Sequence, residues 1–177
     1  FYNTNLSVHN LDVFNSSAED AVNIVNSKFN FDNVSVSNTF SDAIDIDFSS
    51  GEIKNAVISN VGGDGIDLSG SKVNLSKIEV TFVKDKGLSV GEKSDVNIRQ
   101  SLFSDIGVGI VSKDGSNVVA KNVRFEDFKL YAAMAYVKKP MFGTPKLKIF
   151  KSNISFSERN KSYFSQMKSS IFVDGEK

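Results

Sequence analysis

Acidic residues recur at regular intervals through the middle of the chain. Asp45 and Asp47 stand on either side of Ile46, and Asp67 follows Asp45 by 22 residues. A group of carboxylates could bind Ca²⁺, which prefers several oxygen ligands. Two carboxylates could instead act as acid and base, or as acid and nucleophile, on a glycosidic bond. We therefore take Asp45, Asp47 and Asp67 as candidate metal ligands, and Asp67 also as a candidate catalytic residue.

Further charged residues follow this acidic group. Lys86 stands 22 residues after Asp64, and Glu92, Lys113 and Asp114 come in the next two stretches. Stacked carboxylates repel one another unless a cation or a lysine lies between them. We expect Lys86 and Lys113 to lie beside the carboxylates, and we take Glu92 and Asp114 as candidate substrate-binding residues on the same surface.

The composition excludes several classes of site and partner. The chain of 177 residues has no cysteine and one histidine, His9, so it has no disulfide, no thiolate zinc site and no Ser-His-Asp triad. The formal net charge is zero, although acidic residues are in excess before residue 129 and basic residues after it. We expect no nucleic-acid partner and, because no run of about 18 apolar residues occurs, no membrane insertion.

The acidic residues belong to an internal repeat. Apolar residues recur in columns at steps of 22 residues, and a column of small residues precedes them. The first apolar column contains Val22, Ile44, Ile66, Leu88, Ile110 and Ala132, the second contains Ile24, Ile46, Leu68, Val90, Ser112 and Met134, and the small column contains Ala21, Ala43, Gly65, Gly87 and Gly109. The small column predicts a backbone that needs either a small side chain or a positive φ.

Another column marks a bend in every repeat. Its members are Asn10, Asn33, Asn55, Lys77, Gln100 and Asn122. Apolar residues stand mostly at positions −4, −2, +1 and +3 around each member, so the alternation typical of a half-buried strand changes phase there. The chain must turn within one residue, and asparagine tolerates the left-handed conformation that such a turn requires. Each repeat is therefore predicted to contain three short strands.

These features predict an all-β fold, a single-stranded parallel β-helix with laps of about 22 residues. Laps stacked at a strand spacing of about 4.8 Å make three parallel sheets around one apolar core. The phenylalanines are predicted to lie in this core, as Phe29, Phe31 and Phe103 do in their columns. Asp45 and Asp67 are then neighbours on adjacent laps, on the outer face of the first sheet.

The repeats resemble the right-handed parallel β-helix repeat of the pectate-lyase-like superfamily, best over residues 5–135. The segments DAIDIDFSSG (42–51), DGIDLSGS (64–71), DKGLSVGEKS (85–94) and YVKKPMFG (136–143) are similar to blocks in bacterial β-helix repeat proteins. Those proteins are often secreted and mostly lack an assigned activity. The resemblance implies polysaccharide as the partner and an extracellular, cell-surface or periplasmic location, but it does not imply one reaction.

The lyases of this superfamily suggest one use of the acidic group. Ca²⁺, the one cofactor that the sequence suggests, would hold a uronate carboxylate while Lys86 or Lys113 removes a proton in a β-elimination. These two lysines are therefore candidate catalytic residues. A polygalacturonase-like hydrolase would also need a histidine and an Arg-x-Lys pair, and the first sheet has neither. The function predicted is polysaccharide binding or processing in an acidic groove.

Three plainer interpretations stand beside this one. The groove binds a glycan or another protein without catalysis. Aspartates at the strand starts, such as Asp42 and Asp64, cap turns, while the others are solvated and paired with Lys86 and Lys113. The whole rod is a structural spacer or an adhesin-type stalk, and its length is its function.

Residues 137–146 are predicted to form an inserted loop beside the first sheet, after regular laps over residues 1–136. Tyr136 could stack on a sugar ring, and Lys138 and Lys139 could bind an acidic sugar, so these three are candidate substrate-binding residues. Residues 147–177 are predicted to form irregular terminal laps. We expect a single domain cut from a longer protein, the rest of which covers the open N-terminal end of the helix.

Overall fold

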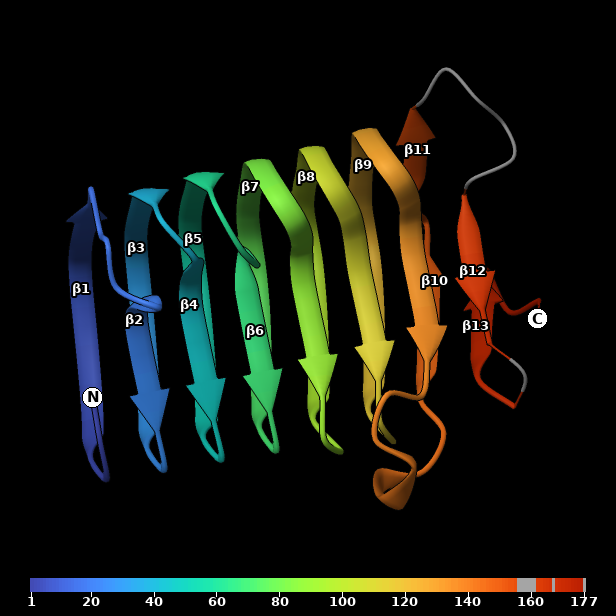
Figure 1. Ribbon diagram of the computed structural model, residues 1–177, viewed down its shortest axis with the longest axis horizontal. Coiled ribbons are helices and arrows are strands. Elements are labelled where there is room, and N and C mark those ends of the chain that lie inside the picture. The colour runs from blue at the N-terminus through green and yellow to red at the C-terminus, as the bar shows by residue number, and fades with distance from the viewer. Residues whose placement is uncertain (156–161, 167, 177) are drawn as a thin grey trace.

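The chain winds into a rod of stacked laps (Figure 1). The computed structural model describes residues 1–155, 162–166 and 168–176. Its strands are β1 (Asn5–Phe14), β2 (Asp20–Val25), β3 (Lys28–Thr39), β4 (Asp42–Asp47), β5 (Ser50–Val61), β6 (Ile66–Ser69), β7 (Lys72–Gly91), β8 (Asp95–Lys113), β9 (Asn117–Tyr136), β10 (Lys146–Phe150), β11 (Asn153–Ser155), β12 (Tyr163–Ser165) and β13 (Ser170–Val173). A 3₁₀ turn, η1 (Pro140–Phe142), lies between β9 and β10. No helix of the described residues is long and apolar enough to cross a membrane.

Each lap pairs in parallel with the next. Phe31 in β3 pairs with Ile53 in β5, and Ile53 pairs with Leu75 in β7, so one lap contains 22 residues. The same parallel pairing continues from β7 to β8 and from β8 to β9. The parallel β-helix predicted from the repeat is confirmed.

The bends that divide a lap are left-handed residues, as predicted. Asn33 has a φ of 59°, and even Lys77 and Gln100, which suit this conformation less well, have φ values of 55° and 53°. Backbone pairing continues around the bends, so one coiled sheet has three faces. The first face is formed by β2, β4, β6 and the last parts of β7 to β9. The second face precedes the Asn33 column, and the third follows it.

The core is a stack of aliphatic and aromatic side chains. Phe31 and Phe103 are fully buried, and the Phe103 and Phe125 rings are stacked with centroids 5.8 Å apart. The prediction that the phenylalanines lie in the core was wrong for a second group. Phe14, Phe40, Phe48 and Phe82 are exposed, because they stand at or beside the corners, where side chains point outward.

The column of small residues exists because neighbouring atoms leave no room for a larger side chain. A Cβ on Gly87 would lie 2.4 Å from a ring carbon of Phe103, and one on Gly109 would lie 2.5 Å from a ring carbon of Phe125. Neither glycine has a positive φ, so the alternative explanation that the sequence allowed is wrong. Glycine is required at these laps because the phenylalanine stack and, at Gly109, the Ala132 carbonyl oxygen 2.3 Å from the Cβ position fill the space.

A ladder of buried serines closes the corner that follows the first face. The backbone N–H of each serine donates to the hydroxyl of the serine one lap later, from Ser27 to Ser49, Ser71, Ser94 and Ser116. Because these N–H groups are buried, the hydroxyls satisfy donors that would otherwise have no partner. Sequence reasoning missed this ladder.

The last regular lap is one residue longer than predicted. Ile110 pairs with Ala133 and Ser112 with Ala135, whereas the repeat had assigned Ala132 and Met134 to these positions. The register shifts between Ile106 and Val108, where β9 has one extra residue. Tyr136 therefore pairs with Lys113.

Residues 137–145 form a loop, with η1 in it, that projects below the ends of β8 and β9 in Figure 1; Lys146, which the prediction included in the loop, already begins β10. After it, β10 pairs with the start of β9, β11 and β12 pair with later parts of β9, and β13 pairs with β10. Phe156, which the sequence placed in the terminal laps, lies outside the described residues. At the other end, β1 pairs with β3 on one side only.

Candidate functional site

The acidic residues lie on the outer side of the first face. Side chains alternate along β4, so Ile44 and Ile46 are fully buried while Asp45 and Asp47 point outward. Asp45 pairs with Asp67 in β6, as predicted. The register makes one polar row along the rod, which consists of Asn23, Asp45, Asp67 and Ser89.

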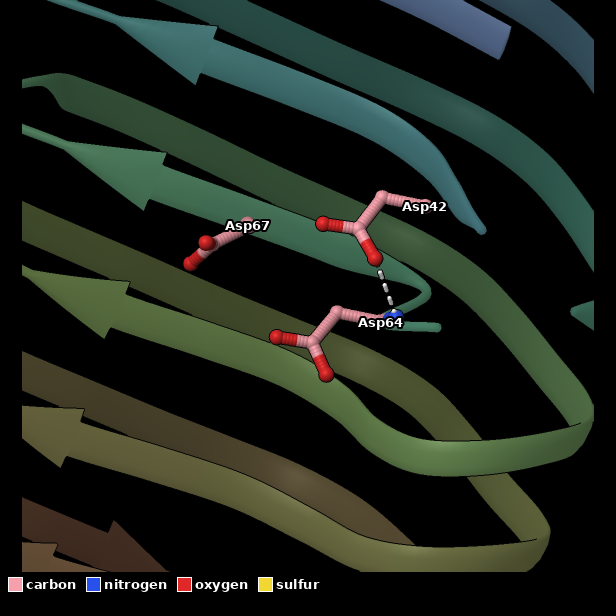
Figure 2. A group of neighbouring side chains, drawn as sticks. All are labelled: Asp42, Asp64 and Asp67. Carbon is pink, nitrogen blue, oxygen red and sulfur yellow. Dashed lines mark hydrogen bonds between the residues drawn. The ribbon is translucent and has the colours of Figure 1, made fainter. Parts of the chain in front are cut away.

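Three carboxylates come together at the start of this face (Figure 2). Asp42 begins β4, Asp64 precedes β6 and Asp67 lies within β6; one carboxylate oxygen from each lies within 4.8 Å of the other two. Asp67 is thus grouped with residues at the strand starts, and Asp45 and Asp47 lie outside this group. Residue spacing alone did not reveal this grouping, because the grouping depends on the path of the chain at the corner.

The aspartates at the strand starts also support the backbone. Asp42 Oδ1 accepts a hydrogen bond from the Asp64 N–H at 2.7 Å, which Figure 2 shows. Asp64 Oδ1 accepts from the Lys86 N–H at 3.0 Å. Each carboxylate therefore caps the start of the next lap. This agrees with the capping interpretation, except that the bonded N–H belongs to the neighbouring lap.

Lys86 is held as a cation by two carboxylates. Its Nζ lies 3.1 Å from Asp64 Oδ1 and 2.5 Å from Asp85 Oδ2. Burial acts to lower the pKa of Lys86, but the negative charges of Asp64 and Asp85 outweigh burial and raise this pKa. While these ion pairs persist, Lys86 is protonated and cannot act as the base of an elimination.

Lys113 reaches back across two laps. Its Nζ lies 3.6 Å from Asp67 Oδ1, and its side chain crosses Gly91, where a Cβ would lie 2.9 Å from Lys113 Cε. Ser89, the neighbour of Asp67 in the polar row, is fully buried, and its Oγ has no hydrogen-bond partner among the described residues. The row therefore ends in a hydroxyl with unused hydrogen-bonding capacity.

The first face carries more carboxyl groups than it can ionise easily. Burial, and then the charges of Asp47 and Asp20, raise the pKa of Asp45 from 3.8 to about 7. Burial also raises the pKa of Asp64 to about 6, against the attraction of Lys86. The pKa values of Asp42 and Asp47 are raised by the same cause.

A divalent cation fits this group only in part. Both oxygens of Asp64 lie within 3.3 Å of Lys86 Nζ, so an ammonium group already supplies positive charge there. Asp42 and Asp67 each keep one oxygen, Oδ2, that has no hydrogen bond to the described residues. Asp42 and Asp67 are therefore the residues that could hold Ca²⁺, with ligands added by water.

The loop residues are organised by a buried carboxylate. Asp114 Oδ1 accepts hydrogen bonds from the backbone N–H groups of Lys138 and Lys139, at 2.6 and 2.5 Å. The Lys139 ammonium also pairs with Glu92, near the acidic face. The sequence had placed Asp114 on the surface, whereas it is buried, and its role is to position the loop.

Tyr136 stands next to Lys113 through their register pairing. It is half-buried, and burial raises the pKa of its hydroxyl, on which the charges of Lys86 and Asp85 also act. Tyr136 therefore borders the acidic face, together with Lys113 and the loop.

A second feature was missed by sequence reasoning. One corner column reads Asn15, Asn38, Asn60, Phe82, Asp105 and Asp127, all with positive φ. Phe82 is the phenylalanine in this polar column, and its position there could have predicted that its ring points outward. Phe40 and Phe82 both line a hollow of about 400 Å³ at this corner.

A family model described as "Right handed beta helix region" matches residues 2–175. The chain belongs to this family. Membership agrees with the parallel coil of about 22-residue laps and makes the protein a right-handed β-helix repeat protein. No curated protein matches the chain. Because folds of this kind carry many functions, the function must be argued from the surfaces of the β-helix.

Proposed function

We propose that this β-helix binds a polysaccharide along the outer side of its first face. The observation that carries the proposal is the polar row of Asn23, Asp45, Asp67 and Ser89, whose members lie one lap apart. A row of hydrogen-bonding groups at a constant spacing of about 4.8 Å suits a ligand that is itself a linear polymer.

The chemistry of the row suits sugar hydroxyls. A hydroxyl group both donates and accepts, and an ionised carboxylate accepts hydrogen bonds that are stronger than neutral ones. Asp45 accepts one hydrogen bond from Asn23 Nδ2 at 2.9 Å, and because its pKa is raised to about 7, its carboxyl group accepts further bonds when ionised and donates one when protonated. Ser89 has no hydrogen-bond partner among the described residues for its hydroxyl, but it is fully buried, so the half-buried members Asn23, Asp45 and Asp67 carry the proposal.

Lysines and an aromatic ring border the row. Lys113 and Tyr136 lie beside it, and Lys139 projects from the loop toward Glu92. These side chains offer donors and one ring face to the same ligand. Binding, rather than elimination, is the function that this arrangement supports best, because Lys86 is engaged as a cation. Calcium binding on the first face, predicted at Asp45, Asp47 and Asp67, stays a prediction, and Asp42 and Asp67 are the residues that could hold the ion.

Binding to polygalacturonate, alginate and xylan tests the proposal. The double variant Asp45→Asn, Asp67→Asn should lower affinity for at least one of them by about tenfold or more, the effect of losing hydrogen bonds to charged groups. Asp32→Asn is the matched control, because Asp32 is a carboxylate on the second face. Affinity electrophoresis and isothermal titration calorimetry provide the measurements.

Two further experiments test whether calcium takes part in binding and whether the protein cleaves polysaccharide by elimination. EDTA should weaken binding if calcium takes part, and Asp42→Asn should then remove the effect of EDTA. Absorbance of unsaturated product from polygalacturonate reports elimination. If none of the three polysaccharides binds, or if the double variant binds like the wild type, the proposed function is wrong and the spacer interpretation gains support.

A further inference from the structure

The corner hollow lies where the third face ends and the first face begins. In Figure 1 the ends of β3 and β5, which lead into this corner, are at the upper edge of the rod. It has a volume of about 400 Å³. Among its lining residues are Phe40, Phe82, Asn38, Asn60, Gly62 and Lys84. None of them belongs to the polar row of the proposed site.

Two aromatic rings flank this hollow at a defined spacing. Thr39, Val61 and Val83 pair in register on three successive laps. Phe40 follows the first of these residues and Phe82 precedes the third, so the two phenylalanines are two laps apart, about 10 Å along the rod. These two residues are 77% and 62% exposed. The lap between them has Gly62 at the position equivalent to Phe40, where a Cβ would lie 1.9 Å from the Phe40 carbonyl oxygen, so this lap adds no side chain there.

A ladder of side-chain amides lines the same hollow. Asn60 Nδ2 donates to Asn38 Oδ1 at 2.7 Å, and Asn38 Nδ2 donates to Asn15 Oδ1 at 3.1 Å. Each primary amide has two N–H donors and a carbonyl with two lone pairs. One N–H of Asn38 and of Asn60 therefore has no partner among the described residues and can bond to a ligand in the hollow.

Phe82 is unfavourable where it stands. Its φ is 55°, in the left-handed region that disfavours a bulky side chain, and the same column has asparagine or aspartate in the other laps. Its ring gains little from burial, because most of it faces solvent. A residue that lowers stability both through a strained backbone and through an exposed apolar ring is typical of a binding site.

We propose that the corner hollow is a second carbohydrate site, which takes a neutral polysaccharide chain across Phe40 and Phe82. A pyranose ring has apolar C–H faces that pack on an aromatic ring and hydroxyls at its edge that bond to amides. A chain of several such units is long enough to contact both phenylalanines, which line the same hollow on laps two apart. A protein partner would instead need a continuous apolar centre, and here Asn60 and Gly62 separate the rings.

Titration calorimetry with cellohexaose, mannohexaose and xylohexaose tests this site. At least one of them should bind the wild type, and Phe40→Ala and Phe82→Asn should each weaken that binding by about tenfold. Phe82→Asn should at the same time raise Tm, because asparagine suits the left-handed backbone. A binding site lost together with a gain in stability cannot be explained by misfolding.

Phe48→Asn is the matched control. Phe48 also has a positive φ, of 48°, and is 64% exposed, but it does not line this hollow. Its substitution should raise Tm and leave hexasaccharide affinity unchanged.

Three results would overturn the inference. One is that no hexasaccharide binds, and another is that affinity is unchanged in Phe40→Ala and Phe82→Asn. The third is self-association of the wild type that both variants abolish, which would make the hollow an interface between copies. The double variant of Asp45 and Asp67 separates the two sites. If polysaccharide binding depends on the aspartates and not on the phenylalanines, the proposed function stands and this inference fails. If binding depends on the phenylalanines and not on the aspartates, this inference stands and the proposed function fails.

Discussion

Asp45 lies among residues of its own charge. Burial and its acidic neighbours raise its pKa to about 7, from 3.8. Between these two values the unfolded chain has released the proton and the folded chain still binds it. The folded state therefore binds more protons, and the free energy of unfolding falls as the pH rises through this interval. Asp64, with its pKa raised to about 6, acts in the same direction.

Thermal unfolding at about pH 5 and about pH 8 checks this at the residue scale. The wild type should have the lower Tm at the higher pH. Asp45→Asn should raise Tm at the higher pH and change it little at the lower one, because asparagine keeps an oxygen for Asn23 and carries no charge. Asp32→Asn is the control, since the pKa of Asp32 is lowered and its contribution has the opposite sign. A lower Tm for Asp45→Asn than for the wild type at about pH 8 would contradict the argument.

Residue identities predicted where the acidic side chains lie and that Lys86 and Lys113 lie beside carboxylates, but not which carboxylate each lysine contacts. The repeat placed Asp45 and Asp67 on adjacent laps, because a constant lap length is enough to establish that. It could not predict that Lys113 crosses two laps to Asp67, since the direction of a long, flexible side chain is not set by its column. Nor could it group Asp42 with Asp67, because the corner between β5 and β6 decides that distance.

At the scale of elements, the corners hold the laps in register. The serine ladder supplies one acceptor per lap to a buried backbone N–H. Ser71 accepts from the Ser49 N–H at 2.9 Å, and its own hydroxyl donates to a backbone carbonyl. The ladder is thus a continuous set of bonds along one edge of the rod.

Ser71→Ala should therefore lower the free energy of unfolding by about 1–3 kcal/mol, the cost of leaving a buried donor without a partner. Ser59→Ala is the matched control, because Ser59 is on the outer side of β5 and should change stability little. Urea unfolding monitored by circular dichroism measures both variants. Equal midpoints for the two would show that the ladder contributes nothing to stability.

The elements were predictable to different degrees. The bend at the Asn33 column could be predicted because the alternation of apolar and polar residues changes phase there. The structure has a positive φ at every member of this column. The serine column has the same period, but serine is also common in exposed turns, so its inward direction could not be read. The extra residue in β9 was missed because Ala132 and Ala133 fit a core position equally well, and both are fully buried.

The whole molecule is stabilised by contacts between neighbouring laps. Each lap pairs only with the one before and the one after, so stability is close to a sum of lap and interface contributions. β1 has a partner on one side only, and its inward residues Leu6 and Val8 are half-buried, whereas Leu68 in β6 is fully buried. The ends should therefore open more easily than the middle.

Native-state hydrogen exchange should show this gradient. Backbone amides of β5 to β8 should exchange most slowly, and those of β1 and β13 fastest, because local opening requires the loss of fewer contacts there. Leu68→Ala, which should cost about 2–5 kcal/mol, should speed exchange in the laps on both sides of it. Uniform protection along the rod would contradict the additive picture.

The parallel register also determines how the protein responds to a mechanical load. The hydrogen bonds between laps run along the rod, and each boundary between two laps bears the whole of an axial load. Tension along this axis would peel laps away one after another at low force, beginning at an end. Tension along a strand would instead shear a row of parallel bonds together and meet far more resistance. The rod is therefore strong across its axis and weak along it.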